Sequence, residues 1–173
     1  MSNTNNLVIF DVDGTLSDPF LRMKYISGEG KKNWGAFFRE AKEDFLVSHV
    51  SKMYKLLHIL GHDIRVVTGR PEHLREDTLA WFDLYGLPLT TEKLFMRANS
   101  DRRPDFLVKQ DIFTSWNVPP QDVFCVFEDR LQVVAMWKSL GLKVFVCGGD
   151  YEDSPGYLKY HEHMERIKGY IAA

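Results

Sequence analysis

The sequence of 173 residues has few cysteines and no large excess of either charge. Cys125 and Cys147 are the only two, and both lie in apolar stretches, which favours buried free thiols over a disulfide scaffold or a metal site. The formal net charge is −2, with 22 Lys and Arg against 24 Asp and Glu. That balance excludes a broad basic surface, so we expect no binding along a long nucleic-acid duplex.

Long hydrophobic runs are absent as well. The longest, such as Leu7–Phe10 and Val144–Val146, fall far short of the roughly 18 residues that a membrane span needs. Residues 1–6 are polar and lack the basic and apolar regions of an export signal. We therefore expect a soluble, cytoplasmic protein with one core and no membrane partner. The sequence predicts no particular oligomeric state.

Short apolar runs alternate along the chain with stretches of helical periodicity. The runs predict strands over residues 7–10, 64–67, 94–96, 123–127 and 144–147. Between them, apolar residues recur at intervals of three and four over residues 50–60, 74–85, 106–116 and 133–140, which predicts helices. This alternation indicates an α/β fold, with a doubly wound parallel sheet of about five strands.

Two stretches stand outside the alternation. Residues 19–48 interrupt the chain after the first strand and include a short helix predicted from Trp34. Residues 151–173 are typical of a loop followed by a terminal helix that packs on the core. We therefore expect a catalytic core formed by residues 1–18 and 49–150, with a small helical cap inserted over residues 19–48.

Polar side chains follow the predicted strands at the points where the strands end. In an open parallel sheet, ligands bind beyond the carboxyl ends of the strands. Residues distant in sequence are thus expected to converge there, namely Asp11, Asp13, Thr68, Arg70, Arg97, Glu128 and Asp129.

The segment Asp11-Val-Asp13-Gly-Thr15 is the most specific of these sites. Residues two apart on an extended chain point the same way, so both carboxylates can face one pocket. One can attack phosphorus while the other protonates the leaving oxygen. Two like charges need a counter-charge, which Mg²⁺ bound with the help of Asp129 would supply. A calcium loop is excluded because Arg22 stands where that loop needs a glutamate.

Two further segments carry groups that suit a phosphate. Thr68-Gly-Arg70 follows a strand and precedes a helix that Pro71 is expected to open, so a hydroxyl and backbone N–H groups would meet there. Alone, this segment is equally typical of a helix cap. Lys109 lies on the predicted helix after Asp105, where its ammonium can neutralise a phosphate and the nucleophile.

This ordered set of residues resembles the haloacid dehalogenase superfamily of phosphohydrolases, whose members form an aspartyl-phosphate and use Mg²⁺. The resemblance implies a HAD-like Rossmannoid fold, Asp11 as nucleophile, and Asp13 as general acid/base that also binds metal through its backbone carbonyl. It further implies that Thr68 and Lys109 hold the phosphate and that Asp129 binds the metal.

A more specific resemblance concerns the 3′-phosphatase domains of bacteriophage polynucleotide kinase/phosphatases. It rests on Val67-Thr-Gly-Arg70, Met96-Arg97, Asp101-Arg-Arg103-Pro-Asp105 with Val108-Lys109, Glu128-Asp-Arg130 with Gln132-Val-Val134 and Met136-Trp137, and Gly149-Asp150. It covers residues 6–18 and 50–151. The residues that it implies for substrate binding or support are Thr15, Arg70, Arg97, Asp105 and Arg130.

Two positions depart from that family's pattern. Thr68 stands where that family often has serine, and it keeps the hydroxyl. Glu128 stands where aspartate is usual, so its longer side chain changes the reach of a carboxylate that is expected to lie just beyond the direct ligands of the metal. No P-loop motif of a kinase occurs. We therefore expect a phosphatase without a kinase activity.

The insertion combines positive charge with aromatic residues. Residues 19–42 contain six Lys or Arg and two Glu, which is typical either of a solvated face or of a rim that attracts an anionic substrate. Trp34, Phe37 and Phe38 either form a small core of the cap or supply a ring that stacks on a base.

The leading hypothesis is therefore a Mg²⁺-dependent phosphomonoesterase acting on 3′-phosphate ends of nucleic acids. A nucleoside monophosphate phosphatase is the alternative within the same chemistry, and a catalytically inactive binding module is a remote one. A signalling receiver domain is disfavoured because Arg97 follows the third strand, where a receiver carries its aspartate.

Overall fold

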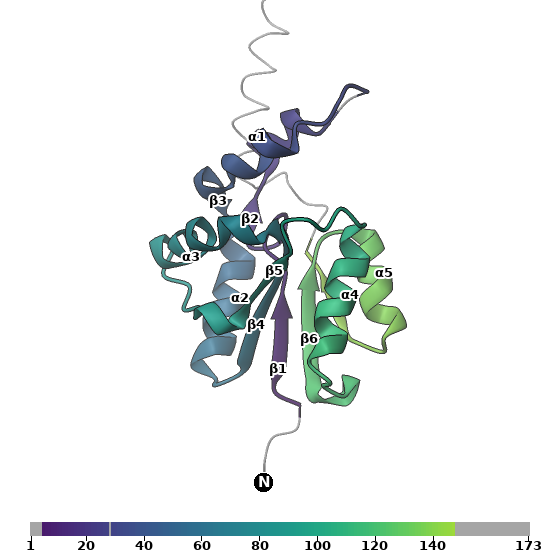
Figure 1. The fold of residues 1–173 in the computed structure, drawn as a ribbon. Coiled ribbons are helices and arrows are strands. Elements are labelled where there is room, and N and C mark those ends of the chain that lie inside the picture. Colours follow the sequence, from purple (N-terminus) through teal and green to yellow (C-terminus); the bar gives the residue numbers. More distant parts are fainter. Residues whose placement is uncertain (1–4, 28, 148–173) are drawn as a thin grey trace, which may run out of the picture.

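The computed structural model describes residues 5–27 and 29–147 and is built around one parallel sheet. Its strands lie in the order β5-β4-β1-β6-β7 (Figure 1). The chain starts in the middle of the sheet and extends it outward in both directions, so the predicted doubly wound parallel sheet of five strands is confirmed. The bounds are β1 Leu7–Phe10, β4 Asp63–Pro71, β5 Leu94–Arg97, β6 Val123–Glu128 and β7 Val144–Val146.

Helices cover both faces of the sheet. On one face α2 (Ser48–Ile59) and α3 (Arg75–Leu84) share a buried apolar cluster with Val8 and Phe10 of β1. On the other face α4 (Asp105–Ser115) and α5 (Leu131–Ser139) share a second cluster with Leu7 and Ile9. Alternate side chains of β1 thus enter opposite clusters, which explains why its sequence is apolar throughout.

Short 3₁₀ segments complete the connections. They are η3 Glu72–Leu74, η4 Thr91–Lys93 and η5 Pro120–Asp122. The helical segment expected to open at Pro71 begins as a 3₁₀ helix: β4 continues through Pro71, which is the N-cap residue of η3, and α3 follows at Arg75. The pairing register shifts between Thr68 and Pro71, so the strand bulges there before the chain enters η3. No helix N-terminus therefore follows Thr68 directly.

The insertion after β1 folds above the carboxyl edge of the sheet (Figure 1). A two-stranded antiparallel ribbon closes its base, with Ser17 opposite Leu46 and Asp18 opposite Phe45. Between the two strands lie a 3₁₀ helix, the predicted short helix that begins at Trp34, and a second 3₁₀ helix. The elements are β2 Ser17–Asp18, η1 Phe20–Tyr25, α1 Trp34–Arg39, η2 Ala41–Glu43 and β3 Phe45–Leu46.

Some expectations fall at the limits of the described chain. Cys125 and Cys147 are free thiols as predicted, although only Cys125 is buried and Cys147 is half-buried. Gly149-Asp150 and the terminal loop and helix expected over residues 151–173 lie outside the described residues. Within residues 5–27 and 29–147, no helix has the length and apolar character that crossing a membrane requires.

Two apolar residues of α3 test how stability depends on the core. Phe82 is 1% exposed and its ring lies 6.1 Å from that of Tyr54, whereas Leu84 is 72% exposed. Phe82→Ala should lower the free energy of unfolding by about 3–5 kcal/mol, because it leaves a cavity beneath the sheet. Leu84→Ala should change it by less than about 0.5 kcal/mol. Urea denaturation measures both, and equal effects would contradict the assignment of the core.

Candidate active site

The loop after β1 brings the first two candidate carboxylates to the edge of the sheet. The Asp11 N–H donates to the Phe127 carbonyl at 3.0 Å, so the ladder with β6 continues one residue beyond β1. The carbonyl of Val12 then accepts from the N–H groups of Leu16 and Ser17, both at 2.8 Å. This tight turn fixes the direction in which each aspartate leaves the backbone.

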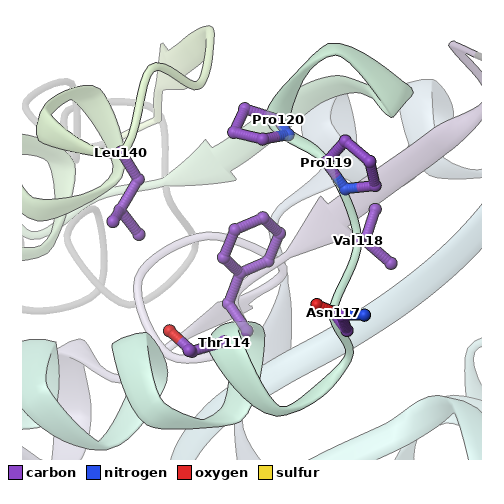
Figure 2. Close-up of a pocket in the computed structure, with 7 residues that line it drawn as sticks. Thr114, Asn117, Val118, Pro119, Pro120 and Leu140 are labelled. Atoms are coloured by element: carbon purple, nitrogen blue, oxygen red, sulfur yellow. The ribbon is translucent and has the colours of Figure 1, made fainter.

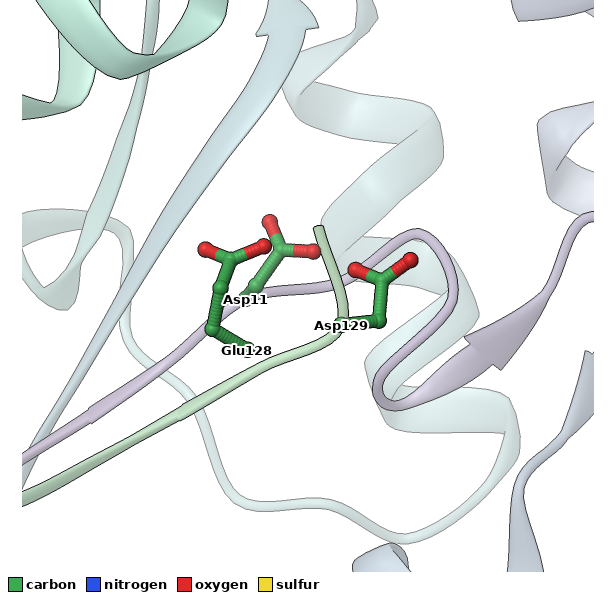
Figure 3. A group of neighbouring side chains, drawn as sticks. All are labelled: Asp11, Glu128 and Asp129. Carbon is green, nitrogen blue, oxygen red and sulfur yellow. The ribbon is translucent and has the colours of Figure 1, made fainter. Parts of the chain in front are cut away.

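Three carboxylates, those of Asp11, Glu128 and Asp129, meet beside that turn (Figure 3). One oxygen from each lies within 4.8 Å of the others. Glu128 ends β6 next to β1, which explains why residues so distant in sequence come together. The predicted convergence of Asp11 with Glu128 and Asp129 is therefore present in the structure.

Two residues of the turn accommodate Asp129. Gly14 has a φ of +92°, and a Cβ at this position would overlap the Asp129 carboxylate. The hydroxyl of Thr15 donates to Asp129 Oδ1 at 3.4 Å. A glycine is thus required for both its backbone conformation and its lack of a side chain.

Lys109 places a buried ammonium among these acids. It lies on α4 and is 1% exposed, and its Nζ donates to Asp11 Oδ1 at 2.6 Å and to Glu128 Oε2 at 2.8 Å. The Asp105 carboxylate lies 3.5 Å from the same Nζ. Contact with these carboxylates keeps the pKa of Lys109 well above its ordinary value, even though burial opposes this. Lys109 therefore lies against Asp11, as we expected.

The site carries more negative charge than Lys109 neutralises. Burial, followed by the neighbouring Glu128 carboxylate, raises the pKa of Asp11 well above its ordinary value. The same two causes raise the pKa of Asp129 to about 7. Three clustered oxygen ligands with an unmatched negative charge are the donor set that a hard divalent cation such as Mg²⁺ prefers. The residues present therefore fit such an ion.

The Asp13 side chain lies in a different electrostatic environment. Its Oδ1 accepts hydrogen bonds from Arg22 Nη2 at 2.5 Å, from Arg70 Nη2 at 2.6 Å and from Ser17 Oγ at 3.2 Å. Burial alone would raise the pKa of Asp13, but the two guanidinium groups lower it well below its ordinary range. Asp13 is thus held as an ionised carboxylate apart from the acidic cluster.

Arg22 and Asp44 are functional candidates that the sequence analysis missed. Arg22 is 1% exposed and binds Asp44 through two hydrogen bonds of 2.8 and 2.6 Å, so it does not belong to an exposed basic rim. The Asp44 backbone carbonyl in turn accepts from Trp81 Nε1 at 2.9 Å. Both residues lie in the insertion, where no motif or spacing distinguishes them from solvated charges.

Arg70 and Thr68 support the site from inside the fold. Arg70 is 1% exposed and its Nε also donates to Asp13 Oδ1, at 2.9 Å. We expected Arg70 either to bind the substrate or to support other residues of the site. Its burial and its bonds to Asp13 favour the supporting role. Thr68 is fully buried, and its hydroxyl accepts the Arg70 N–H at 3.2 Å.

A second group of charges surrounds Asp105 at the start of α4. Arg97 Nη2 donates to Asp105 Oδ1 at 3.0 Å, and Arg130 Nη1 lies 3.5 Å from Asp105 Oδ2. Arg97 also donates to the Gly69 carbonyl at 3.1 Å, which ties β5 to the bulge in β4. The Arg130 side chain remains 53% exposed, so it is the member of this group that is open to solvent.

A hollow lies at the C-terminal end of α4, opposite to the end that carries Asp105 (Figure 2). It is lined by Phe113, Thr114, Asn117, Val118, Pro119, Pro120 and Leu140. This end precedes β6, whereas Glu128 is the last residue of that strand and Asp129 follows it. The hollow is therefore separate from the cluster of candidate site residues.

The sequence matches the model of the polynucleotide kinase PNKP phosphatase domain over residues 5–151. It is also 28% identical over 145 residues to a putative bifunctional polynucleotide kinase/RNA ligase of Autographa californica nuclear polyhedrosis virus. That alignment covers 83% of this chain and 20% of the viral protein. The chain thus corresponds to a small part of this curated relative.

Solved structures give a consistent result. A chain in a structure of the Pnkp1/Rnl/Hen1 complex is 27% identical, with a TM-score of 0.69 and coverage of 86% of this chain and 47% of that one. A second structure, of the Pnkp1/Rnl/Hen1 RNA repair complex, gives a TM-score of 0.65 at 27% identity, covering 83% of this chain and 42% of that one. The fold is shared by class C acid phosphatase from Bacillus anthracis, with a TM-score of 0.59 at 18% identity. That match covers 88% of this chain and 73% of the phosphatase chain.

A pair of glycine substitutions tests the fit of Asp129 beside the turn. Gly14→Ala should lower phosphatase activity at least about tenfold, because the new Cβ displaces the Asp129 carboxylate. Steady-state release of phosphate from p-nitrophenyl phosphate measures the effect.

Gly61→Ala is the matched control. Gly61 also has a positive φ, of +81°, but an added Cβ there meets no atom within 4 Å. Both variants should lose about 1 kcal/mol of stability through backbone strain, and the control should keep its activity. Equal activity of the two variants would contradict a role for the space at Gly14.

Proposed function

Because the chain belongs to the family of polynucleotide kinase phosphatase domains and is a phosphoric monoester hydrolase, we propose that it removes 3′-phosphates from nucleic-acid ends through an aspartyl-phosphate on Asp11. The observation that carries this proposal is the contrast between the two aspartates of one turn. Asp11 lies among Lys109 and two further carboxylates, whereas Asp13 is held separately by two arginines.

In the first proposed step, a carboxylate oxygen of Asp11 attacks phosphorus and the bond from phosphorus to the 3′ oxygen breaks. Because Asp13 is ionised in the free protein, the proton comes from the singly protonated phosphate of the substrate: Asp13 accepts it and passes it to the leaving oxygen, so that a 3′-hydroxyl departs. In the second step, water attacks the aspartyl-phosphate and gives its proton to Asp13. The bond between phosphorus and Asp11 then breaks, and the proton on Asp13 leaves with the phosphate, which restores both carboxylates.

The contacts of Asp13 support its role as acid/base. All its hydrogen bonds from the described residues reach one oxygen, Oδ1, and these come from Arg22, Arg70 and Ser17. The carboxylate is thereby fixed in orientation, while Oδ2 accepts none of these bonds and is available for proton transfer. Its side chain is 19% exposed, so it lies open toward the site more than the buried arginines do.

The metal site that we propose comprises Asp11, Asp129 and the backbone carbonyl of Asp13, with Glu128 beside it. The clustered carboxylates of Asp11, Glu128 and Asp129 support this assignment, although the Glu128 side chain also binds Lys109. A bound Mg²⁺ would supply Lewis-acid stabilisation of the phosphoryl oxygens and offset the repulsion between the acids.

Several cationic groups are suited to the substrate phosphate. Lys109 lies directly against Asp11, so its ammonium can neutralise both the nucleophile and the group that it attacks. Thr68, Thr15 and Asp105 hold the neighbouring groups in place through the contacts described above. Arg97 and Arg130 are proposed to act at the mouth of the site, where Arg130 is half exposed.

The substrate assignment rests on family membership and on the insertion. Relatives with the same domain include proteins described as a polynucleotide kinase/RNA ligase and as part of an RNA repair complex. The insertion over residues 19–48, which lies above the carboxyl edge of the sheet, is proposed to be a cap that limits access to the site (Figure 1). A free 3′ end is a substrate that such a covered site can admit.

A comparison of substrates tests the proposal. The wild type should release phosphate from a 3′-phosphorylated oligonucleotide with a higher kcat/KM than from nucleoside 3′- or 5′-monophosphates, because more of the substrate is bound. Asp11→Asn should lose at least about a thousandfold in kcat, because the nucleophile is lost, while keeping its thermal stability within a few degrees, because Lys109 retains its contact with Glu128 and one of the crowded negative charges is removed. Malachite green detection of phosphate measures both.

The matched control is Asp122→Asn, because Asp122 is half-buried in η5 at the other end of the sheet. It should keep full activity. Activity on mononucleotides alone would replace the 3′-end assignment with a nucleotidase, and retained turnover in Asp11→Asn would refute the aspartyl-phosphate.

Removal of the metal gives an independent prediction. Chelation with EDTA should abolish turnover, and adding Mg²⁺ to the chelated protein should raise its melting temperature because the ion binds the folded state. Asp129→Asn should lose most of this thermal shift, since one anionic ligand is removed. Differential scanning fluorimetry measures the shift without relying on activity.

Asp63→Asn serves as the control for charge, because Asp63 starts β4 far from the carboxyl edge of the sheet and lies outside the acidic cluster. It should keep the shift. A shift that is the same in wild type and Asp129→Asn would contradict the proposed ligand.

A further inference from the structure

The insertion exposes a tryptophan above the site. Trp34, the first residue of α1, is 43% exposed although its indole is the largest apolar side chain in the insertion. Phe37, one turn further along the same helix, is 5% exposed and packs into the core of the insertion. The structure thus separates two roles that the sequence left open. Phe37 fills the core, and the face of Trp34 remains available.

Neighbouring rings hold the indole in place. Its centroid lies 5.6 Å from that of Phe37, with an edge contact, and 5.9 Å from that of Phe38, at an interplanar angle of 26°. The N-terminal end of α1 is fixed by Asn33, whose side chain accepts the Ala36 N–H at 3.0 Å. A ring that is both exposed and fixed costs little conformational entropy when it binds a ligand.

The exposed indole is linked to the Asp13 carboxylate by two packing contacts and one hydrogen bond. The Arg22 guanidinium lies 4.0 Å from the centroid of the Phe37 ring, on which Trp34 packs. The same guanidinium donates to Asp13 at 2.5 Å. These successive contacts connect Trp34 to Asp13, which lies in the same turn as Asp11.

A lysine side chain lies beside the Trp34 ring. Lys32 Nζ lies 5.8 Å from the centroid of the Trp34 ring, and Lys31 and Lys32 are both exposed. A nucleotide offers an aromatic base to a ring and an anionic phosphate to an ammonium. One nucleotide can thus satisfy both groups, whereas a small phosphate ester without a base can satisfy only the ammonium.

We propose that Trp34 stacks on the terminal base of a 3′-phosphorylated strand, with Lys32 against the adjacent backbone phosphate. This inference rests on the proposed function and identifies the part of the substrate, beyond its 3′-phosphate, that the protein recognises. Stacking on an aromatic side chain tolerates every base, so the platform selects for the presence of a base and not for its identity.

The test compares two oligonucleotides that differ only in their 3′-terminal nucleoside, one normal and one abasic, each with a 3′-phosphate. Trp34→Ala should lower kcat/KM on the normal strand by about 5- to 150-fold and leave kcat/KM on the abasic strand unchanged. Trp34→Phe should recover most of the loss because it keeps a ring. Leu21→Ala, which removes a side chain of the insertion that is 40% exposed, should affect neither substrate.

Equal losses on the two strands would overturn the inference, because they would indicate that Trp34 only stabilises the insertion. Unchanged kinetics on both strands would overturn it as well. In either case wild-type activity on the normal strand leaves the proposed function standing. A wild type that is inactive on both oligonucleotides but cleaves other phosphomonoesters would overturn the proposed function, and with it this inference.

Discussion

One buried ammonium among carboxylates is the constraint on which the site depends. Lys109 is almost fully buried and contacts Asp11 of the first strand's turn and Glu128 at the end of β6. A buried charge that loses its partner costs about 3–5 kcal/mol, so α4, β1 and β6 must keep the register that brings these groups together. The negative charge that Lys109 does not neutralise would be offset by the divalent cation of the proposed metal site.

A second set of buried charges gives the two aspartates of one turn different properties. Arg22 and Arg70 hold Asp13 as a fixed, ionised carboxylate, whereas burial and neighbouring acids raise the pKa of Asp11. Asp44 completes this set by binding Arg22, and its backbone is held by Trp81 of α3. The insertion is thus connected to the core through the site itself, so its position and the orientation of Asp13 are coupled.

The positions of the five strands of the main sheet, its doubly wound order and the convergence of Asp11, Glu128 and Asp129 were all predictable. Each follows from a pattern within a few residues, or from the rule that carboxyl ends of parallel strands share an edge. The pairing of Arg22 with Asp44 was not predictable, because it depends on how the insertion folds back. The bulge that carries β4 through Pro71 was also not predictable, since proline is compatible with both a helix start and an edge of a bulged strand.

The sequence by itself determined the chemistry of this protein: a pair of aspartates on one turn, a lysine and an acidic pair, each placed where a strand or helix meets the same edge. These are local properties, because hydrophobic periodicity fixes the elements and the residues adjoining them. Only the tertiary structure decided which carboxylate meets an ammonium and which meets two guanidiniums, and that Phe37 is buried while Trp34 is exposed. Such choices depend on side-chain reach and packing between segments far apart in the chain, which no local pattern encodes.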